Sequence, residues 1–281
     1  MGLSSASFIE PDRRFAGAAD PLGLIGRTAV NGYRAVDHLP AFRTRNPLID
    51  DLLGRERDAS LRYEDQCSPR YYLDVADAVV ARRGDIRRIV EVGVFLGGAS
   101  EVFASGTRIL DYELDLVDVD ADYLGFTHER LRRVCPEAVD RVRLFHGSLP
   151  EYVRTVLLPE ATSGVFVHHD ASHRFEQVVK DLSALSFVRE QVLTLAIQDT
   201  NLRGRIGYCN FVDAAVWAVF GRDVACEPIG AVFDETQVEM VNPNRFEGNY
   251  FMPGVAEGML IDFDENSFLY PHPTMTIDEF L

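Results

Sequence analysis

The sequence predicts an α/β fold, a doubly wound and mostly parallel sheet of seven strands with an N-terminal helical elaboration. Three observations support this prediction. Short runs of β-branched residues alternate with amphipathic segments over residues 68–220. The runs have apolar residues on both faces, as expected of strands that are buried on both faces. Each of the first five runs ends in polar or glycine-rich residues, so binding groups should gather at one edge of the sheet.

The composition indicates a globular protein. The chain has 281 residues, of which 47% are apolar, so one large domain with a sizeable core is expected. The net charge of −16 disfavours nucleic acid and anionic membranes as partners, because both bind basic surfaces. The four cysteines form no C-x-x-C pair, the start of the chain does not resemble a signal peptide, and no apolar run approaches membrane-spanning length. We therefore expect a cytoplasmic protein with reduced thiols.

Residues 1–66 have no regular pattern. Prolines interrupt short amphipathic pieces such as Leu22–Tyr33 and Pro47–Leu53, so we expect short helices and loops. A lid over the site and a scaffold layer are both compatible with this segment. Residues 67–281 form the main domain. It opens with a helix that Ser68 caps and Pro69 begins.

The alternation of elements follows from the apolar pattern. Strands are predicted at Arg88–Val92, Leu114–Val119, Val142–Phe145, Gly164–His168 and Val192–Gln198, and helices at Ala99–Ala104, Tyr123–Val134, Pro150–Leu157, Phe175–Ser186 and Tyr208–Phe220. The alternation stops after Gly221. Two further strands, Val224–Val232 and Gly258–Phe263, should add an antiparallel pair at the sheet edge, joined through a loop at Asn242–Gly254.

A glycine-rich turn follows the first strand. Because Gly93, Gly97 and Gly98 lack side chains, a ligand can lie against the backbone, and the next helix presents unpaired N–H groups. The spacing is neither the dinucleotide pattern G-x-G-x-x-G nor a P-loop, which disfavours a nicotinamide cofactor.

Polar residues end the next strands. Asp118 suits the two hydroxyls of a ribose, although capping the following helix is an alternative. Gly147-Ser148 is a small polar turn that suits the edge of an adenine ring. The fourth strand runs into residues 168–173, which include three histidines, and the fifth into residues 198–201. These strand ends together favour an adenosine-like ligand.

Two stretches carry a family resemblance. Glu91-Val-Gly93-Val-Phe-Leu-Gly97-Gly98-Ala-Ser100 resembles the first motif of class I S-adenosylmethionine-dependent methyltransferases. Asp170-Ala-Ser-His173-Arg-Phe175-Glu176 resembles the cephalosporin hydroxylase/rhamnosyl O-methyltransferase-like branch, over roughly residues 68–220. The chain departs from that branch in three places. Ala171 replaces a glycine, no Pro-Gly-Gly turn precedes the fifth strand, and Gln198-Asp199 replaces an acid pair.

The resemblance implies a Rossmann-like methyltransferase fold, with residues 67–281 as the S-adenosylmethionine-binding catalytic domain. It also implies a role for each matching residue. Glu91, Gly93 and Gly97 would line the methionine part of the cofactor, with Gly98 and Ser100 in the same loop; Asp118 would bind the ribose; Gly147 and Ser148 would approach the adenine; and Asp170 and Asp199, with Gln198 or Asn201, would hold a divalent metal such as Mg²⁺.

The predicted function is metal-assisted O-methylation of a small molecule, a sugar or a hydroxylated natural product. A Mg²⁺ ion orients neighbouring hydroxyls and lowers the pKa of the attacking one. His173, close to the transferring methyl, or else His169, would take the proton, with Asp170 as a further catalytic group. We expect His168 to be buried and structural.

Three alternatives remain open at this point. Asp170 is also well placed to cap the following helix instead of binding metal. The fold also accommodates metal-independent N- or carboxyl-methyl transfer, or a non-catalytic scaffold that only binds the cofactor. The family resemblance leaves room for a homo-oligomer.

Overall fold

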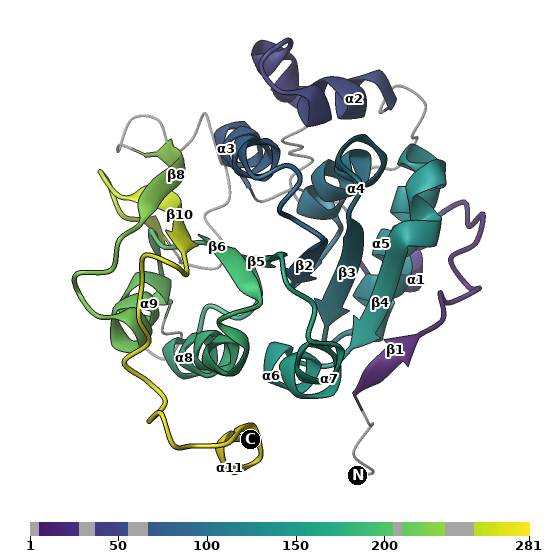
Figure 1. The fold of residues 1–281 in the computed structure, drawn as a ribbon. Helices are drawn as coiled ribbons and strands as arrows, with labels where there is room; N and C mark the ends of the chain where they lie inside the picture. Colours follow the sequence, from purple (N-terminus) through teal and green to yellow (C-terminus); the bar gives the residue numbers. More distant parts are fainter. Residues whose placement is uncertain (1–5, 28–36, 56–66, 205–209, 234–249) are drawn as a thin grey trace.

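The computed structural model describes residues 6–27, 37–55, 67–204, 210–233 and 250–281. Its central layer is an eight-stranded sheet (Figure 1). The strands are β1 (Ser7–Ile9), β2 (Arg88–Val92), β3 (Glu113–Asp118), β4 (Val142–His146), β5 (Val165–His169), β6 (Val192–Gln198), β8 (Glu227–Val232) and β10 (Ala256–Asp262). They lie in the order β1-β4-β3-β2-β5-β6-β10-β8. The middle five are parallel, β10 is antiparallel to both β6 and β8, and β1 is antiparallel to β4.

Helices cover both faces of this sheet (Figure 1). One face carries α3 (Pro69–Ala81), α4 (Gly98–Leu110) and α5 (Ala121–Val134), and the other carries α6 (Leu149–Tyr152), α8 (Phe175–Ala184) and α9 (Val212–Phe220). Shorter pieces complete the chain: α1 (Pro21–Leu24), α2 (Pro47–Arg55), α7 (Leu158–Glu160), α11 (Ile277–Phe280), the 3₁₀ turns Leu39–Phe42, Pro136–Arg141 and Leu185–Val188, and a π-helical turn at Val153–Leu157. None of the described helices is long and apolar enough to span a membrane.

The core has two halves because successive strand residues point to opposite faces. In β2, Ile89 packs in the apolar cluster that contains Phe103 of α4, while Val90 packs in the cluster that contains Val178 of α8. Every residue of β2 and of β5 is buried. Burial on both faces explains why these strands have apolar residues on both faces.

The predicted architecture is confirmed: the five parallel strands and the antiparallel edge pair are present. The sheet nevertheless has eight strands instead of seven, because Ser7–Ile9 adds β1 against β4. Three residues are too short for strand periodicity to show in the sequence. A second, two-stranded sheet of β7 (Leu202–Arg203) and β9 (Tyr250–Phe251) was also not predicted. The start of the helix predicted at Tyr208 and most of the loop predicted at Asn242–Gly254 lie outside the described residues.

The N-terminal segment divides into two parts. Its helix α2 packs against α4 as a scaffold layer on the core. The other part is residues 6–27. In it, Phe15 and Leu22 form an apolar cluster with Leu96 of the glycine turn and Phe126 of α5. This first part therefore lies beside the loop in which the sequence places the cofactor. Residues 28–33 of the predicted piece Leu22–Tyr33 lie outside the described residues.

Candidate functional site

A cavity of about 540 Å³ opens at the carboxyl ends of the parallel strands. Its size falls in the range of about 300–1,000 Å³ that is usual for small-molecule sites. Five of the predicted site residues line it: Gly93, Asp118, Gly147, Ser148 and Asp170. The remaining wall comes from Val92, Phe95, Val117, Val119, Tyr123, Leu149, Ala171, Ser172, Arg174, Gln177 and Asp181. Four neighbouring strand ends thus share one pocket, as expected for an open parallel sheet.

The glycine turn can adopt its shape only because side chains are missing. Gly93 has φ +82°, and a Cβ there would lie 2.2 Å from the carbonyl oxygen of Asp170. Gly97, with φ +79°, caps α4, and a Cβ there would lie 2.8 Å from the Cγ2 of Thr127. Gly98 is the first residue of α4. The turn therefore passes close to the loop after β5 and brings the start of α4 to the sheet edge.

An aromatic wall was missed by the sequence analysis. Phe95 lies inside the glycine turn with φ +43°, a backbone conformation that is strained for a bulky residue. Its ring contacts that of Tyr123 edge-on at 5.5 Å between centroids, and both line the cavity. The Arg27 guanidinium lies 4.7 Å from the Phe95 ring centroid. In the sequence, the sign of this wall is a phenylalanine between the glycines of the turn.

Glu91 and Ser100 lie behind the turn and do not line the cavity. Both are buried, and Glu91 Oε2 has no hydrogen-bond partner among the described residues. Burial raises the pKa of Glu91 to about 8, and the negative charge of Asp170 adds to this effect. The Glu91 carboxyl is therefore largely protonated at neutral pH, which makes it a hydrogen-bond donor as well as an acceptor.

Asp118 accepts hydrogen bonds from two backbone N–H groups, and its ribose-binding role stays a prediction. Its Oδ2 accepts the Val94 N–H at 2.9 Å, and its Oδ1 accepts the Asp120 N–H at 2.9 Å. It therefore holds the glycine turn and the start of the next helix together. A carboxylate offers about four acceptor positions, so two remain for the hydroxyls of a ligand. Burial raises the pKa of Asp118, while these backbone N–H groups oppose the shift.

The turn after β4 is fixed by a capping box. Ser148 Oγ donates to Glu151 Oε2 at 2.7 Å and accepts the Glu151 N–H at 3.4 Å, so the Ser148 side chain caps α6. The Gly147 N–H donates to the Asp118 carbonyl at 2.9 Å. Residues 147–149 line the cavity, and the Ser148 hydroxyl among them is held by Glu151.

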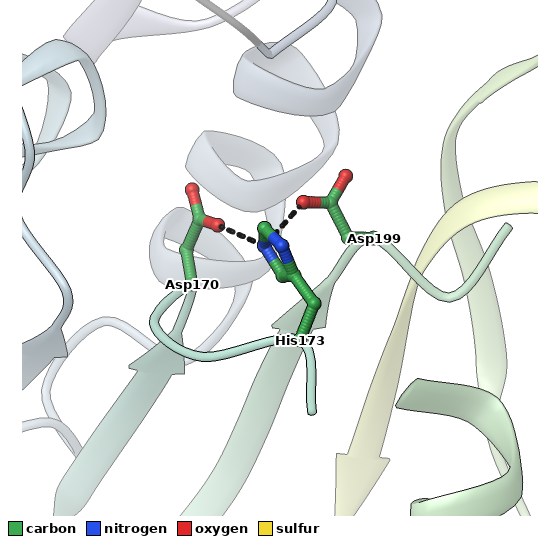
Figure 2. Close-up of side chains that lie close together, drawn as sticks. All are labelled: Asp170, His173 and Asp199. Carbon is green, nitrogen blue, oxygen red and sulfur yellow. Dashed lines mark ion pairs between the residues drawn. The ribbon is translucent and has the colours of Figure 1, made fainter. Parts of the chain in front are cut away.

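A second group of predicted residues meets at the rim of the cavity. Asp170 follows β5, Asp199 follows the neighbouring β6, and the His173 ring lies between their carboxylates (Figure 2). His173 Nε2 is 2.8 Å from Asp199 Oδ2 and 4.0 Å from Asp170 Oδ1. Burial lowers the pKa of His173, but the two carboxylates outweigh it and raise the pKa to about 10. Asp199 has φ +61°, an uncommon conformation that directs its side chain toward His173.

This group has the donors of a divalent-metal site. One ligand atom from each of Asp170, His173 and Asp199 lies within 4.8 Å of the others. Two carboxylate oxygens and an imidazole nitrogen suit a hard or borderline cation that completes its coordination with water or with substrate oxygens. The residues present therefore fit a metal. The same geometry also allows a protonated His173 to form an ion pair with Asp199, with Asp170 farther away.

The other two predicted metal ligands lie in different surroundings. The Gln198 amide is buried, and its Nε2 donates to Glu257 Oε1 at 3.3 Å and to Cys67 Sγ at 3.4 Å. Asn201 is fully buried, and its side-chain amide has no hydrogen-bond partner among the described residues. Their metal-binding role stays a prediction.

Glu257 was missed by the sequence analysis. It lies on β10, far along the chain, in what looked like an ordinary edge strand. Its buried carboxylate accepts the Ser68 N–H at 2.8 Å, the Ala231 N–H at 3.1 Å and the Ser68 hydroxyl. Burial raises the pKa of Glu257 to about 7, against these hydrogen bonds. Glu257 thus lies next to Gln198, whose amide donates to it.

The two histidines that end β5 point to opposite faces of the sheet. His168 lies under α3, where its Nε2 is 3.1 Å from the Tyr71 hydroxyl, and burial lowers its pKa to about 4. It is buried and hydrogen-bonded, as predicted. His169 points toward α8 and pairs with Asp181, with 3.0 Å between Nε2 and Oδ2. This contact separates His169 from the Asp170–His173–Asp199 group, so the geometry favours His173 over His169 as the proton acceptor.

Comparisons with known proteins identify the fold. No protein-family model and no curated protein matches the sequence. Among solved structures, an O-methyltransferase from Bacillus cereus in complex with S-adenosylhomocysteine superimposes with a TM-score of 0.50 at 13% identity, over 82% of this chain and 98% of that one. Weaker likenesses include an O-methyltransferase of tomaymycin synthesis from Streptomyces achromogenes (TM-score 0.45, 14% identity, 90% and 99% covered) and a calicheamicin methyltransferase (TM-score 0.45, 14% identity, 91% and 95% covered). The chain therefore has the Rossmann-like fold of the class I S-adenosylmethionine-dependent methyltransferases.

Proposed function

We propose that this protein is an S-adenosylmethionine-dependent methyltransferase that methylates a hydroxyl group of a small molecule with the help of a divalent metal. One observation carries the proposal. Asp170 both lines the cavity at the glycine turn and belongs to the Asp170–His173–Asp199 group. The pocket suited to the methyl donor and the groups suited to activate an acceptor therefore share one residue.

The cavity supports the choice of cofactor. At Gly93 the missing Cβ lets the loop after β5 lie against the turn, which brings Asp170 into the wall of the cavity. Asp118 keeps acceptor positions for a ribose diol, and the turn at 147–149 offers backbone and an apolar side chain to a flat base. The bound cofactor would supply an already activated methyl group on a sulfonium. The task of the protein is then to align an acceptor and to remove its proton.

The group at the rim supports the choice of acceptor. Asp170, Asp199 and His173 would hold the metal, and a divalent cation there orients a hydroxylated acceptor and lowers the pKa of its hydroxyl. The Asp199 carboxylate fixes the imidazole of His173 through its Nε2. A bound metal would take the place of the proton between the carboxylates, so His173 would then be neutral and would take the acceptor's proton through a ring nitrogen that the metal leaves free.

A second candidate function is metal-independent methyl transfer to an amine or a carboxylate on the same site. It is favoured by the ion pair between His173 and Asp199, because an imidazolium between two carboxylates supplies the positive charge that a metal would bring. A scaffold that binds the cofactor without catalysis is the third alternative.

We also propose different roles for the N-terminal segment and for the rest of the chain. Residues 67–281 would form the catalytic domain, because the cavity and the rim group lie entirely within them. Residues 6–27, which pack beside the glycine turn, would steady the cofactor end of the cavity, while α2 serves as scaffold.

Calorimetry and methyl-transfer assays test the proposal. We expect the purified protein to bind S-adenosylmethionine at micromolar concentration and to methylate at least one member of a panel of sugars and hydroxylated natural products. Asp199→Asn and chelation should each lower the rate by about 100-fold or more, because both remove charge stabilisation from the reacting oxygen. Asp223→Asn, at an exposed carboxylate, is the matched control.

The outcomes separate the alternatives. Failure to bind S-adenosylmethionine would contradict the proposal as a whole. A rate that survives chelation but falls in Asp199→Asn would favour metal-independent transfer. Cofactor binding without transfer to any panel member would favour the scaffold.

A further inference from the structure

The buried pair of His169 and Asp181 has no part in the proposed chemistry, yet Asp181 lines the cofactor cavity. Its side chain is only 4% exposed and lies on α8. His169 Nε2 is 3.0 Å from Asp181 Oδ2, and Gln177 Nε2 donates to Asp181 Oδ1 at 2.9 Å. A carboxylate at this depth is costly unless donors surround it, so the site fixes its position with two hydrogen bonds.

After these two hydrogen bonds, Asp181 and Gln177 still have hydrogen-bonding groups without a partner among themselves. A carboxylate accepts only, so Asp181 has about two acceptor positions left after the bonds from His169 and Gln177. The Gln177 amide has two N–H groups and gives one to Asp181, which leaves the other as a donor. An acceptor and a donor thus stand side by side in the cavity wall.

The position of this pair in the cavity indicates what it contacts. The turn at 147–149, which suits a flat base, leads into α6, and α6 packs against α8. A base in that turn, joined to a ribose at Asp118, therefore lies next to the α8 side of the cavity, which Gln177 and Asp181 line. Adenine presents there an amino group that donates and a ring nitrogen that accepts.

We propose that Asp181, oriented by His169, and Gln177 recognise the adenine base of the cofactor. Asp181 accepts from the exocyclic amino group, and the free N–H of Gln177 donates to a ring nitrogen. His169 is a positioning residue that holds the carboxylate. This inference rests on the proposed function, because it requires that an adenosine-containing cofactor occupies the cavity.

The test compares two bases that differ in one group. Calorimetry would measure the affinities of S-adenosylhomocysteine and of S-inosylhomocysteine, in which a carbonyl oxygen replaces the amino group. For the unmodified protein we expect about 10- to 100-fold tighter binding of the adenine ligand, because the carbonyl would face a buried carboxylate that it cannot satisfy.

Two variants and a control assign this preference to the cluster. Asp181→Asn should reduce the preference to less than about threefold, because an amide can turn its NH₂ toward the carbonyl. Glu176→Gln, an exposed carboxyl on the same helix, should leave it unchanged. Gln177→Leu at a half-buried position should weaken S-adenosylhomocysteine binding severalfold, which provides a second test if Asp181→Asn does not fold.

The outcomes distinguish this inference from the proposed function. If S-adenosylhomocysteine does not bind the unmodified protein, both are wrong. If it binds but the two bases bind equally well, or the preference survives in Asp181→Asn or S-adenosylhomocysteine affinity is unaltered in Gln177→Leu, only the adenine assignment is wrong.

Discussion

The two ends of the central sheet treat their buried charges differently. At the amino end, Asp115 of β3 is fully buried. Its carboxylate accepts hydrogen bonds from Arg143 Nε at 2.7 Å, from Arg143 Nη2 at 2.6 Å and from the Tyr152 hydroxyl. Nearby, Arg88 Nη1 donates to Glu160 Oε2 at 2.6 Å. At the carboxyl end, Asp170 and Asp199 face an imidazole instead of a guanidinium, and Glu91 is partly unpaired.

This difference in pairing indicates that the charges at the amino end serve stability and those at the carboxyl end serve binding. A carboxylate that is fully matched by guanidinium groups stabilises the fold only as long as the match is complete. Acids gathered with incomplete partners are costly to the folded state, and such arrangements concentrate where a ligand completes them. The amino end should therefore respond to substitution with a loss of stability, and the carboxyl end with a loss of binding.

The largest effect on stability is expected at the amino end. Asp115→Asn leaves the guanidinium of Arg143 without its buried counter-charge, and we expect it to lower the free energy of unfolding by about 3–5 kcal/mol. Urea denaturation measures this value. Asp140→Asn, whose carboxylate is 71% exposed and pairs with Arg108, should change it by less than about 1 kcal/mol. Similar losses in both variants would remove the contrast between buried and exposed pairs.

Burial predicts a pH dependence at the carboxyl end. The pKa of Glu91 is raised to about 8 in the folded protein, from an ordinary value of 4.5. Between these values the folded state keeps a proton that the unfolded state has lost, so stability falls as pH rises through this window, by up to about 1.4 kcal/mol per pH unit. Glu91→Gln should make the fall of unfolding free energy with pH less steep from 4.5 to 8, while Glu257 still contributes up to about pH 7. An unchanged slope in this variant would mean that Glu91 does not titrate in the window.

Substitution in the glycine turn should affect binding. Gly93→Ala places a methyl group 2.2 Å from the Asp170 carbonyl oxygen at φ +82°, so the turn must move away from the loop after β5. We expect S-adenosylhomocysteine affinity to fall at least about tenfold, since a positive φ and a close backbone contact are both lost. Gly17→Ala, at φ +71° but with open space around it, is the matched control. Equal effects would indicate backbone strain alone.

The smallest effect is expected from the N-terminal segment. Arg27→Gln removes the guanidinium that lies 4.7 Å from Phe95 and 5.2 Å from Tyr123, and should weaken S-adenosylhomocysteine binding about two- to fivefold. Arg14→Gln, which loses a similar contact with Phe15 away from the cavity, should leave binding unchanged. If Arg27→Gln binds normally, residues 6–27 contribute scaffold only.

The sequence was sufficient for the alternating fold and for the residues at the strand ends. Short runs such as Arg88–Val92 carry their own signal, because a strand buried on both faces is mainly apolar on both. The meeting of Asp170 and Asp199 was also predictable, since neighbouring parallel strands end at the same edge.

Long-range partners could not be predicted. Nothing local shows that Glu257 lies behind Gln198, or that His169 pairs with Asp181 instead of joining His173. The two faces of a strand look alike in sequence when both are buried, so the direction of His169 depends on register and not on pattern. The cap at Ser148 was a local signal, a serine three residues before Glu151, and it has the form of a capping box.

The close approach at Gly93 couples ligand binding at two neighbouring loops. The bare Cα of the glycine turn lies against the backbone of Asp170 and Ala171, so the loop beside the methyl donor and the loop that carries a candidate metal ligand cannot move independently. If a cofactor orders the first loop, it also orders the second. Binding at either place then changes the affinity of the other by the same factor, as thermodynamic reciprocity requires. The affinities for the proposed cofactor and the proposed metal are thus coupled through one missing methyl group.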